Sequence, residues 1–284
     1  MRRFRIGIYE KALPGFLSWP EKFAAAKSAG YDFLEISIDE TGEKLARLKT
    51  GKAERLELRR LSAEAGLPVR TMCLSGHRKY PLGSEDPAVR GRSLRIMEDA
   101  IDFACDLGIR IIQLAGYDEY YGESNARTRD LFYGGLKESV EMAAAAGVIL
   151  AFETMETEFM NTVEKAMAWV DRIGSPWLQV YPDCGNLTNA AKAHGACELE
   201  NLRRGAGHIA ALHLKETVPG KFREIPYGQG HVNFEGIIQT ALELGVGIFV
   251  TEYWYTGQAD YRELVRGSKE FIDGKFRAVG LKKI

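Results

Sequence analysis

The 284-residue sequence has few of the features that mark several common classes of protein. Its four cysteines, Cys73, Cys105, Cys184 and Cys197, form no CxxC pair, which argues against a structural zinc site and leaves free thiols as the expectation. No apolar run approaches the roughly 18 residues that a membrane-spanning helix needs. The opening segment MRRFRIGIYE has three arginines but too short an apolar run for a signal peptide, so a cytoplasmic location is the default expectation.

An excess of positive charge is also missing. The chain has 38 basic and 39 acidic residues, a formal net charge of -1 and five histidines. This balance argues against a general partner role with nucleic acid or a membrane surface. The length fits two small domains or one large α/β barrel, and no linker, low-complexity tract or change of composition divides the chain. We therefore expect one domain over residues 1–284.

Short apolar runs alternate with segments of helical spacing along the chain. The runs that predict strands are 5–9, 33–37, 69–74, 111–115, 148–153, 178–183, 209–215 and 248–252. The segments that predict helices are 21–28, 53–65, 93–107, 129–146, 163–173, 198–204, 234–244 and 261–271. Alternation of this kind predicts parallel βαβ units, and eight units fit a (β/α)8 TIM barrel. A doubly wound open sheet is the alternative, although no GxGxxG follows an early strand.

Glycine punctuates several of these units. Gly30, Gly66, Gly108, Gly147 and Gly245 each stand between a helical segment and the next apolar run. Glycine at the end of a helix readily takes the left-handed conformation that stops the helix. These positions therefore support the predicted boundaries.

The last four apolar runs each carry an ionisable residue near the end. These residues are Glu153 in ILAFE, Asp183 in VYPD, His213 in AALHLK and Glu252 in FVTE. Taken alone, an acid at a strand end is more often a helix cap or a loop salt bridge, and a histidine in a strand is more often a hydrogen-bonded interior residue. In a barrel, however, the strand ends meet at one mouth, where three carboxylates without a cation would repel one another and lose hydration. The set therefore predicts a site for one divalent metal ion, and Mn²⁺, Co²⁺, Zn²⁺ and Mg²⁺ would all fit.

The stretch ALHLKE places two kinds of side chain on its two faces. Since side chains alternate along a strand, His213 and Lys215 share one face while Leu212 and Leu214 share the other. We expect the polar face to point into the barrel. Lys215 then either binds an oxyanion or phosphate of a substrate or pairs with a carboxylate of the rim. Glu35, in an earlier apolar run, is expected to orient a hydroxyl group or a loop.

These residues resemble those of a known family. Xylose-isomerase-like barrels carry metal-binding Glu, Asp, His and Glu after strands five to eight. More narrowly, the chain resembles the L-ribulose-5-phosphate 3-epimerase family, also called L-xylulose-5-phosphate 3-epimerase. The resemblance lies in MCLSGHRKYPLGS (72–84), IQLAGYDEYY (112–121), YPDCGNL (181–187), HLKET (213–217) and IPYGQG (225–230). Two departures are visible, because Asn233 and Glu216 stand where the family often has an acidic residue and the aspartate of HVKD.

The resemblance implies a metal-dependent enzyme that interconverts L-xylulose 5-phosphate and L-ribulose 5-phosphate. Glu153 and Glu252 would be the two bases that remove a proton from C3 and return one to the opposite face. The metal would bind O2 and O3 of the sugar and stabilise a cis-enediolate. Asp183 and His213 would then act as metal ligands alone.

Further residues are expected to contact the small phosphorylated sugar. His77 follows the third predicted strand, and Asn186 and Lys215 lie just past two of the ligands. Arg223 is in the loop after the seventh strand, a region where such barrels often bind phosphate. Such barrels commonly assemble as homodimers or homotetramers, and this is the expectation here.

Three other functions remain open at this level. A metal-dependent sugar isomerase or dehydratase on the same scaffold would use the same four ligands. An abasic-site endonuclease of this fold would need many histidines and a basic DNA-binding face, which five histidines and a net charge of -1 argue against. A metal-stabilised binding protein without catalysis would tolerate the loss of one of the two glutamates.

Overall fold

A computed structural model describes residues 4–280, and within them eight parallel strands form one curled sheet. The first two of the three arginines in the opening segment lie outside this range. The strands are β1 (Arg5–Tyr9), β2 (Phe33–Ile38), β3 (Val69–Leu74), β4 (Ile111–Ala115), β5 (Ile149–Glu153), β6 (Leu178–Val180), β7 (Leu212–Leu214) and β8 (Ile248–Thr251). Their order is β6-β5-β4-β3-β2-β1-β8-β7.

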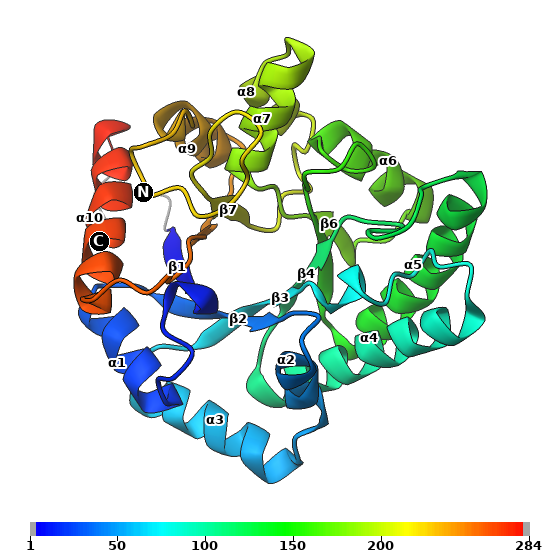
Figure 1. Cartoon of the computed structure of the whole chain (residues 1–284), viewed down its shortest axis with the longest axis horizontal. Helices are drawn as coiled ribbons and strands as arrows, with labels where there is room; N and C mark the ends of the chain where they lie inside the picture. The colour runs from blue at the N-terminus through cyan, green and yellow to red at the C-terminus, as the bar shows by residue number, and fades with distance from the viewer. Residues whose placement is uncertain (1–3, 281–284) are drawn as a thin grey trace.

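The helices lie in a ring outside these strands (Figure 1). Over residues 4–280 they are α1 (Trp19–Ser28), α2 (Gly42–Ala46), α3 (Lys52–Glu64), α4 (Pro87–Leu107), α5 (Ala126–Ala146), α6 (Val163–Ile173), α7 (Cys184–His194), α8 (Glu198–Arg203), α9 (Phe234–Glu243) and α10 (Tyr261–Ala278). Short 3-10 turns cover Glu10–Ala12, Arg47–Lys49 and Gly76–Arg78. The sequence pattern missed α2 and α7, and it made the sixth and seventh strands too long.

The sheet closes between β6 and β7. The two strands are joined by isolated parallel bridges, Val180 to Ile209 and Asp183 to His213. Main-chain N–H groups of Val180 and His213 donate to the carbonyls of His208 and Pro182, each at 2.9 Å. These bonds complete the predicted (β/α)8 barrel, and they place Asp183 beside His213 at the seam.

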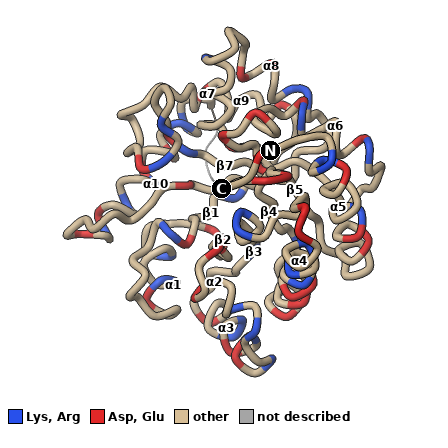
Figure 2. The backbone as a smooth tube through the Cα atoms, turned by 45° about the vertical axis from the view of Figure 1, so that its right-hand side comes forward, with Lys and Arg blue, Asp and Glu red and all other residues tan. Residues whose placement is uncertain are grey.

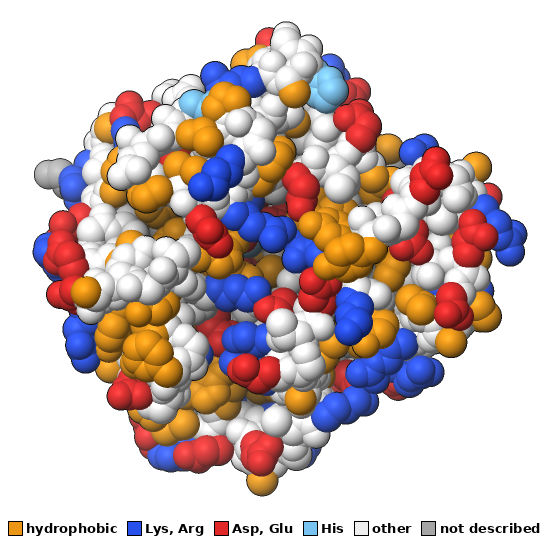
Figure 3. Space-filling view, viewed as in Figure 1, with side chains coloured by type: hydrophobic (Ala, Val, Ile, Leu, Met, Phe, Trp, Pro, Cys, Tyr) orange, Lys and Arg blue, Asp and Glu red, His pale blue; other side chains and the backbone are white. Residues whose placement is uncertain are grey.

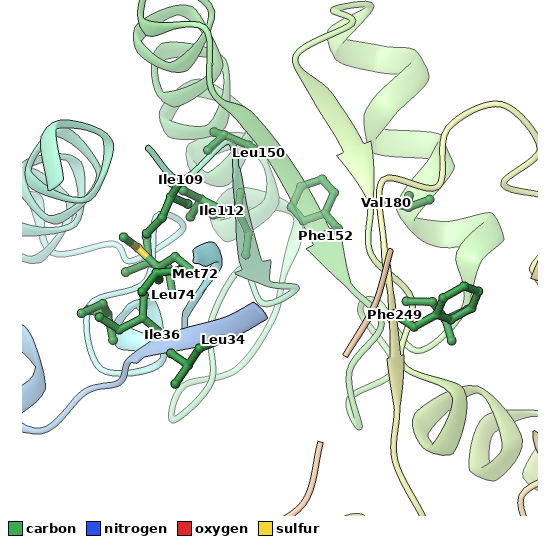
Figure 4. Packing of buried hydrophobic residues seen from close by; sticks show 14 of the residues in the cluster. Leu34, Ile36, Met72, Leu74, Ile109, Ile112, Leu150, Phe152, Val180 and Phe249 are labelled. Carbon is green, nitrogen blue, oxygen red and sulfur yellow. The ribbon is translucent and has the colours of Figure 1, made fainter. Parts of the chain in front are cut away.

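The strands bury apolar side chains on both faces. On the outer face, under the helices, lie residues such as Leu34, Ile36, Met72, Leu74, Ile112, Leu150, Phe152, Val180 and Phe249 (Figure 4). A smaller inner cluster is formed by Tyr9, Phe33, Cys73, Ile111, Ala151, Tyr181, Ala211 and Val250. Leu212 and Leu214 belong to the outer set and Ala211 to the inner one. The expected direction of ALHLKE is therefore confirmed, with His213 pointing into the barrel.

The expected glycine positions are also confirmed. Gly30, Gly66, Gly108, Gly147 and Gly245 all have positive φ, and Gly108 and Gly147 cap α4 and α5 in the left-handed conformation. Across the described residues, no helix combines the length and apolar character needed to cross a membrane.

A close approach inside the barrel explains Gly7 on β1. A Cβ atom at this position would lie 2.3 Å from the ring of Phe33, which is buried in the inner cluster. We expect Gly7→Ala to lower the free energy of unfolding by about 1–3 kcal/mol, because the ring has to move within a packed interior. Urea unfolding followed by circular dichroism measures the change.

Gly134 on α5 offers a matched control. It is exposed, and nothing lies within 4 Å of the Cβ that alanine would add. Gly134→Ala should leave stability unchanged or raise it by up to about 1 kcal/mol, since alanine favours a helix more than glycine does. Equal stabilities of the Gly7→Ala variant and the wild type would contradict the crowding at Phe33.

Candidate active site

Four ionisable side chains converge at the carboxyl ends of the last four strands. Glu153 ends β5, Asp183 follows β6, His213 lies on β7 and Glu252 follows β8. All four are buried, and one ligand atom from each lies within 4.8 Å of those of the others. Figure 2 shows acidic segments at the centre of the molecule, near the strand labels. The structure thus brings together the residues that the sequence pattern predicted as metal ligands.

Asp183 has two structural roles at once. It is the N-cap of α7, and its Oδ1 accepts a hydrogen bond of 2.7 Å from the backbone N–H of Asn186. Within residues 4–280, its buried Oδ2 has no hydrogen-bond partner. A buried carboxylate oxygen is costly without a partner, so Oδ2 fits the role of a cation ligand. The capping role and the ligand role are therefore compatible.

His213 contacts carboxylates through both ring nitrogens. Its Nε2 lies 2.6 Å from Oε1 of Glu35. Its Nδ1 lies 3.2 Å from Glu252 and 3.5 Å from Glu153. The amide nitrogen of Gln113 is 3.1 Å from Nδ1. Gln113 was not among the sequence-based predictions, although a polar residue at an inward position of the run IIQLA is a signal for it.

Burial and neighbouring charges shift the pKa values of the three carboxyl groups in different directions. Burial, followed by the charge of Glu252, raises the pKa of Glu153. Burial raises the pKa of Asp183 to about 7, although Lys215 opposes the shift. Burial would also raise the pKa of Glu252, but Lys215 and His213 outweigh it and hold that pKa below its usual range. This cluster of anions and the donor set of three carboxylates and one imidazole suit a hard or borderline divalent cation.

Lys215 is buried against the same carboxylates. Its Nζ lies 3.2 Å from Asp183 and 3.4 Å from Glu252. Burial alone would lower the pKa of Lys215, but Asp183 and then Glu252 raise it. Of the two partners considered for Lys215, the structure shows the rim carboxylates.

A cavity opens above the four ligands. Its walls include Tyr9, Lys11, Cys73, Ser75, Arg78, Met155, Glu156, Asn186, Phe222, Arg223 and Trp254, together with Glu153, Lys215 and Glu252. In the space-filling view, Lys and Arg side chains gather with acidic ones around a hollow at the middle of the face (Figure 3). Asn186, Lys215 and Arg223, all expected to contact substrate, thus line the same cavity.

His77 takes a different position from the expected one. Its ring is buried, with Nε2 3.2 Å from the backbone carbonyl of Ser93, and burial lowers its pKa to about 4. The next residue, Arg78, lines the cavity instead. Both belong to the short 3-10 turn after β3, where successive side chains point about 120° apart, so the two neighbours face different surroundings.

Two arginines stand at the outer wall. Arg223 lies 3.4 Å from Glu156, to which the Tyr117 hydroxyl also donates. The guanidinium of Arg78 lies over the ring of Tyr120, 4.8 Å from its centroid. Across the described residues, the buried Nε of Arg78 lacks a hydrogen-bond partner. Arg78 and Arg223 therefore present N–H groups to the cavity that Glu156 does not bind.

Glu216 and Asn233, the two residues that depart from the family pattern, both have structural roles. Glu216 is buried, and its carboxylate accepts from the backbone N–H groups of Thr217, Gly228 and Val232, at 3.0 to 3.2 Å. Asn233 is the N-cap of α9 and accepts from Gly236. Glu216 thus holds the loop after β7, which also contains Arg223.

The barrel and its cluster of Glu, Asp, His and Glu define a class of protein. Residues 23–273 match the family described as xylose isomerase-like TIM barrel, and the chain belongs to this family. Solved structures agree on the fold. An L-ribulose 3-epimerase superposes with a TM-score of 0.79 at 19% identity, covering 98% of this chain and 96% of the other. A D-allulose 3-epimerase from Methylomonas sp. superposes with a TM-score of 0.78 at 18% identity, covering 97% and 99%.

Sequence similarity narrows the class. The chain is 44% identical over 281 residues to the L-ribulose-5-phosphate 3-epimerase UlaE of Escherichia coli O157:H7, covering 99% of this chain and 98% of the relative. The same values hold for the protein of that name from Shigella boydii serotype 18. The chain therefore belongs to the L-ribulose-5-phosphate 3-epimerase family, and it is an enzyme of the isomerase class.

The raised pKa values at this site predict how cation binding depends on pH. Because burial raises the pKa of Asp183 to about 7, this group holds its proton at mildly acidic pH, and a cation has to displace that proton. The pKa of Glu153 is raised as well, which acts in the same direction. The affinity for Mn²⁺ should therefore rise between about pH 6 and about pH 8, by roughly tenfold per pH unit for each proton displaced. Chelator competition at several pH values measures it. An affinity independent of pH, with the fold intact by circular dichroism, would contradict this.

Proposed function

We propose that the chain epimerises a ketopentose 5-phosphate at C3, interconverting L-xylulose 5-phosphate and L-ribulose 5-phosphate. The observation that carries the proposal is the pair of buried glutamates, Glu153 and Glu252, which lie 3.5 and 3.2 Å from the same ring nitrogen, Nδ1 of the buried His213. The relatives at 44% identity, which are named for this substrate, support the choice of sugar.

In this proposal, Glu153, Asp183, His213 and Glu252 together hold one divalent cation, which is Mn²⁺, Co²⁺, Zn²⁺ or Mg²⁺. The donor set, the burial of all four residues and the unpartnered Oδ2 of Asp183 within the described chain support this assignment. A cation bound there would polarise the C2 ketone and stabilise the negative charge that develops on the sugar oxygens. The protein residues supply orientation and proton transfer.

Glu153 and Glu252 are the two bases in this proposal. They come from β5 and β8, whose places in the sheet order are far apart, so their carboxylates reach the site from different strands. One carboxylate takes the proton as the C3–H bond breaks and leaves an enediolate. The other carboxyl group donates a proton as a new C3–H bond forms on the opposite face. Their opposite pKa shifts suit a pair with one proton acceptor and one proton donor.

Polar groups of the cavity wall would orient the sugar. Asn186 is buried, donates to the Thr154 carbonyl, and has an Oδ1 atom without a partner among residues 4–280, which suits a sugar hydroxyl. Lys215 is placed to neutralise an oxyanion beside Asp183 and Glu252. Arg223 and Arg78, at the outer wall, would bind the phosphate group.

The two glutamates can be tested separately. We expect Glu153→Gln and Glu252→Gln each to lower kcat by about 10³-fold or more, because each removes a group that carries a proton. The reaction is followed by NMR in deuterated water, where wild-type turnover should place deuterium at C3. Glu158→Gln is the control, since Glu158 is exposed at the same rim and should retain wild-type activity.

Two outcomes would count against the mechanism. Substantial turnover by either single variant would exclude a two-base transfer. Deuterium at C1 with formation of an aldose would assign the protein as a sugar isomerase instead of a 3-epimerase.

The arginine pair is tested by its effect on phosphate recognition. Arg223→Gln and Arg78→Gln should each raise KM for the ketopentose 5-phosphate by roughly 10- to 100-fold, since each removes a charge-assisted contact. The slower reaction with the unphosphorylated ketose should change little. Arg129→Gln is the control, because Arg129 lines a different groove. An equal rise in KM for both substrates would show that the arginines shape the cavity and do not bind the phosphate group.

A further inference from the structure

A fourth carboxylate lies beneath the site, and the proton transfer above does not use it. Glu35 is on β2, has no solvent exposure and points into the barrel. Its Oε1 is 2.6 Å from Nε2 of His213. Its Oε2 accepts hydrogen bonds from the hydroxyl groups of Thr71, at 2.7 Å, and Tyr181, at 2.8 Å. Both oxygens of Glu35 are therefore engaged.

The partners of Glu35 show that its carboxylate accepts hydrogen bonds. Thr71 and Tyr181 both donate to Oε2, and Oε1 is left to face His213 as an acceptor. An acceptor at Oε1 requires a proton on Nε2 of His213. With that proton on Nε2, a neutral ring has its lone pair on Nδ1, which faces Glu252 and Glu153.

The ring of His213 has little freedom to turn. Tyr181 packs against it edge to face, with centroids 4.9 Å apart, and Gln113 lies 3.1 Å from Nδ1 and 3.3 Å from Nε2. Rotating the ring by half a turn about χ2 would bring a carbon atom towards Glu35. The buried carboxylate would then lose a donor, which is unfavourable in a closed interior.

We propose that Glu35 is a positioning residue for the cation site: it holds the Nε2–H tautomer of His213 and aims Nδ1 at Glu153, Asp183 and Glu252. The proposal rests on the cation site proposed above. A carboxylate behind the imidazole also makes the ligand nitrogen more basic, so that it binds a cation more strongly. Thr71 and Tyr181 in turn orient Glu35.

Cation affinity tests this role without relying on turnover. Co²⁺ is the probe, with its visible absorption spectrum and competition by a chelator as the readouts. Glu35→Gln keeps an oxygen acceptor and should weaken Co²⁺ binding by about tenfold, whereas Glu35→Leu removes the acceptor and should weaken it by about 100-fold. The spectrum of the Glu35→Leu complex should also change, because the imidazole is no longer held.

Ser37→Ala is the matched control. Ser37 lies two residues along β2 on the same inward face, is equally buried and bonds to the Tyr9 hydroxyl at 3.1 Å. Its variant should bind Co²⁺ within twofold of the wild type. If Glu35→Leu does not fold, Glu35→Gln decides: a loss of about tenfold supports the proposal, and binding within twofold of the wild type overturns it.

The tautomer can be observed directly. In Zn²⁺-loaded protein labelled with ¹⁵N at histidine, the signals of His213 are assigned by their absence from His213→Gln. We expect a proton on Nε2 and none on Nδ1, and the reverse pattern would overturn the proposal. A wild-type protein that binds neither Co²⁺ nor Zn²⁺ would reject the cation site itself. Normal wild-type binding that Glu35 variants leave unchanged would reject only the role of Glu35.

Discussion

The burial of several like charges at one end of a closed barrel is the constraint on which the site depends. Glu153, Asp183 and Glu252 share a space that water barely reaches, and they face one lysine and one histidine. Carboxylates so confined either take up protons or gather cations. Lys215 and His213 offset part of this negative charge from within the chain. A divalent cation would offset the rest. The positive charge gathered in this way would also stabilise negative charge on a bound sugar.

The barrel interior supports this cluster in layers. Apolar inner residues such as Ile111 and Phe33, which is seated against Gly7, fill the lower part. Above them lies a polar layer in which Thr71 and Tyr181 donate to Glu35, and Glu35 and Gln113 in turn contact the two ring nitrogens of His213. Every strand adds one inward side chain every second residue, so the layers follow from the register of the sheet. A ligand on a strand and backed by hydrogen bonds is held more firmly than one on a loop.

Groups that would recognise the substrate sit on less regular structure. Arg78 is in a turn after β3, and Arg223 is in the loop after β7, which the buried Glu216 anchors through three backbone N–H groups. Such an arrangement separates a common centre on the strands from loops that can differ between relatives. It is consistent with one fold serving epimerases that are named for phosphorylated and for free sugars.

The sequence by itself determined the alternation of strands and helices, the inward face of ALHLKE and the four residues at the strand ends, because a period of two and a glycine stop are local properties. Only the tertiary structure decided that β6 and β7 close the barrel, and that Arg78 lines the cavity while His77 bonds to Ser93. The pairing of Glu35 with His213 spans 178 positions in sequence. No local pattern encodes such a contact, since it exists only once the sheet has closed and brought β2 and β7 to face each other across the interior.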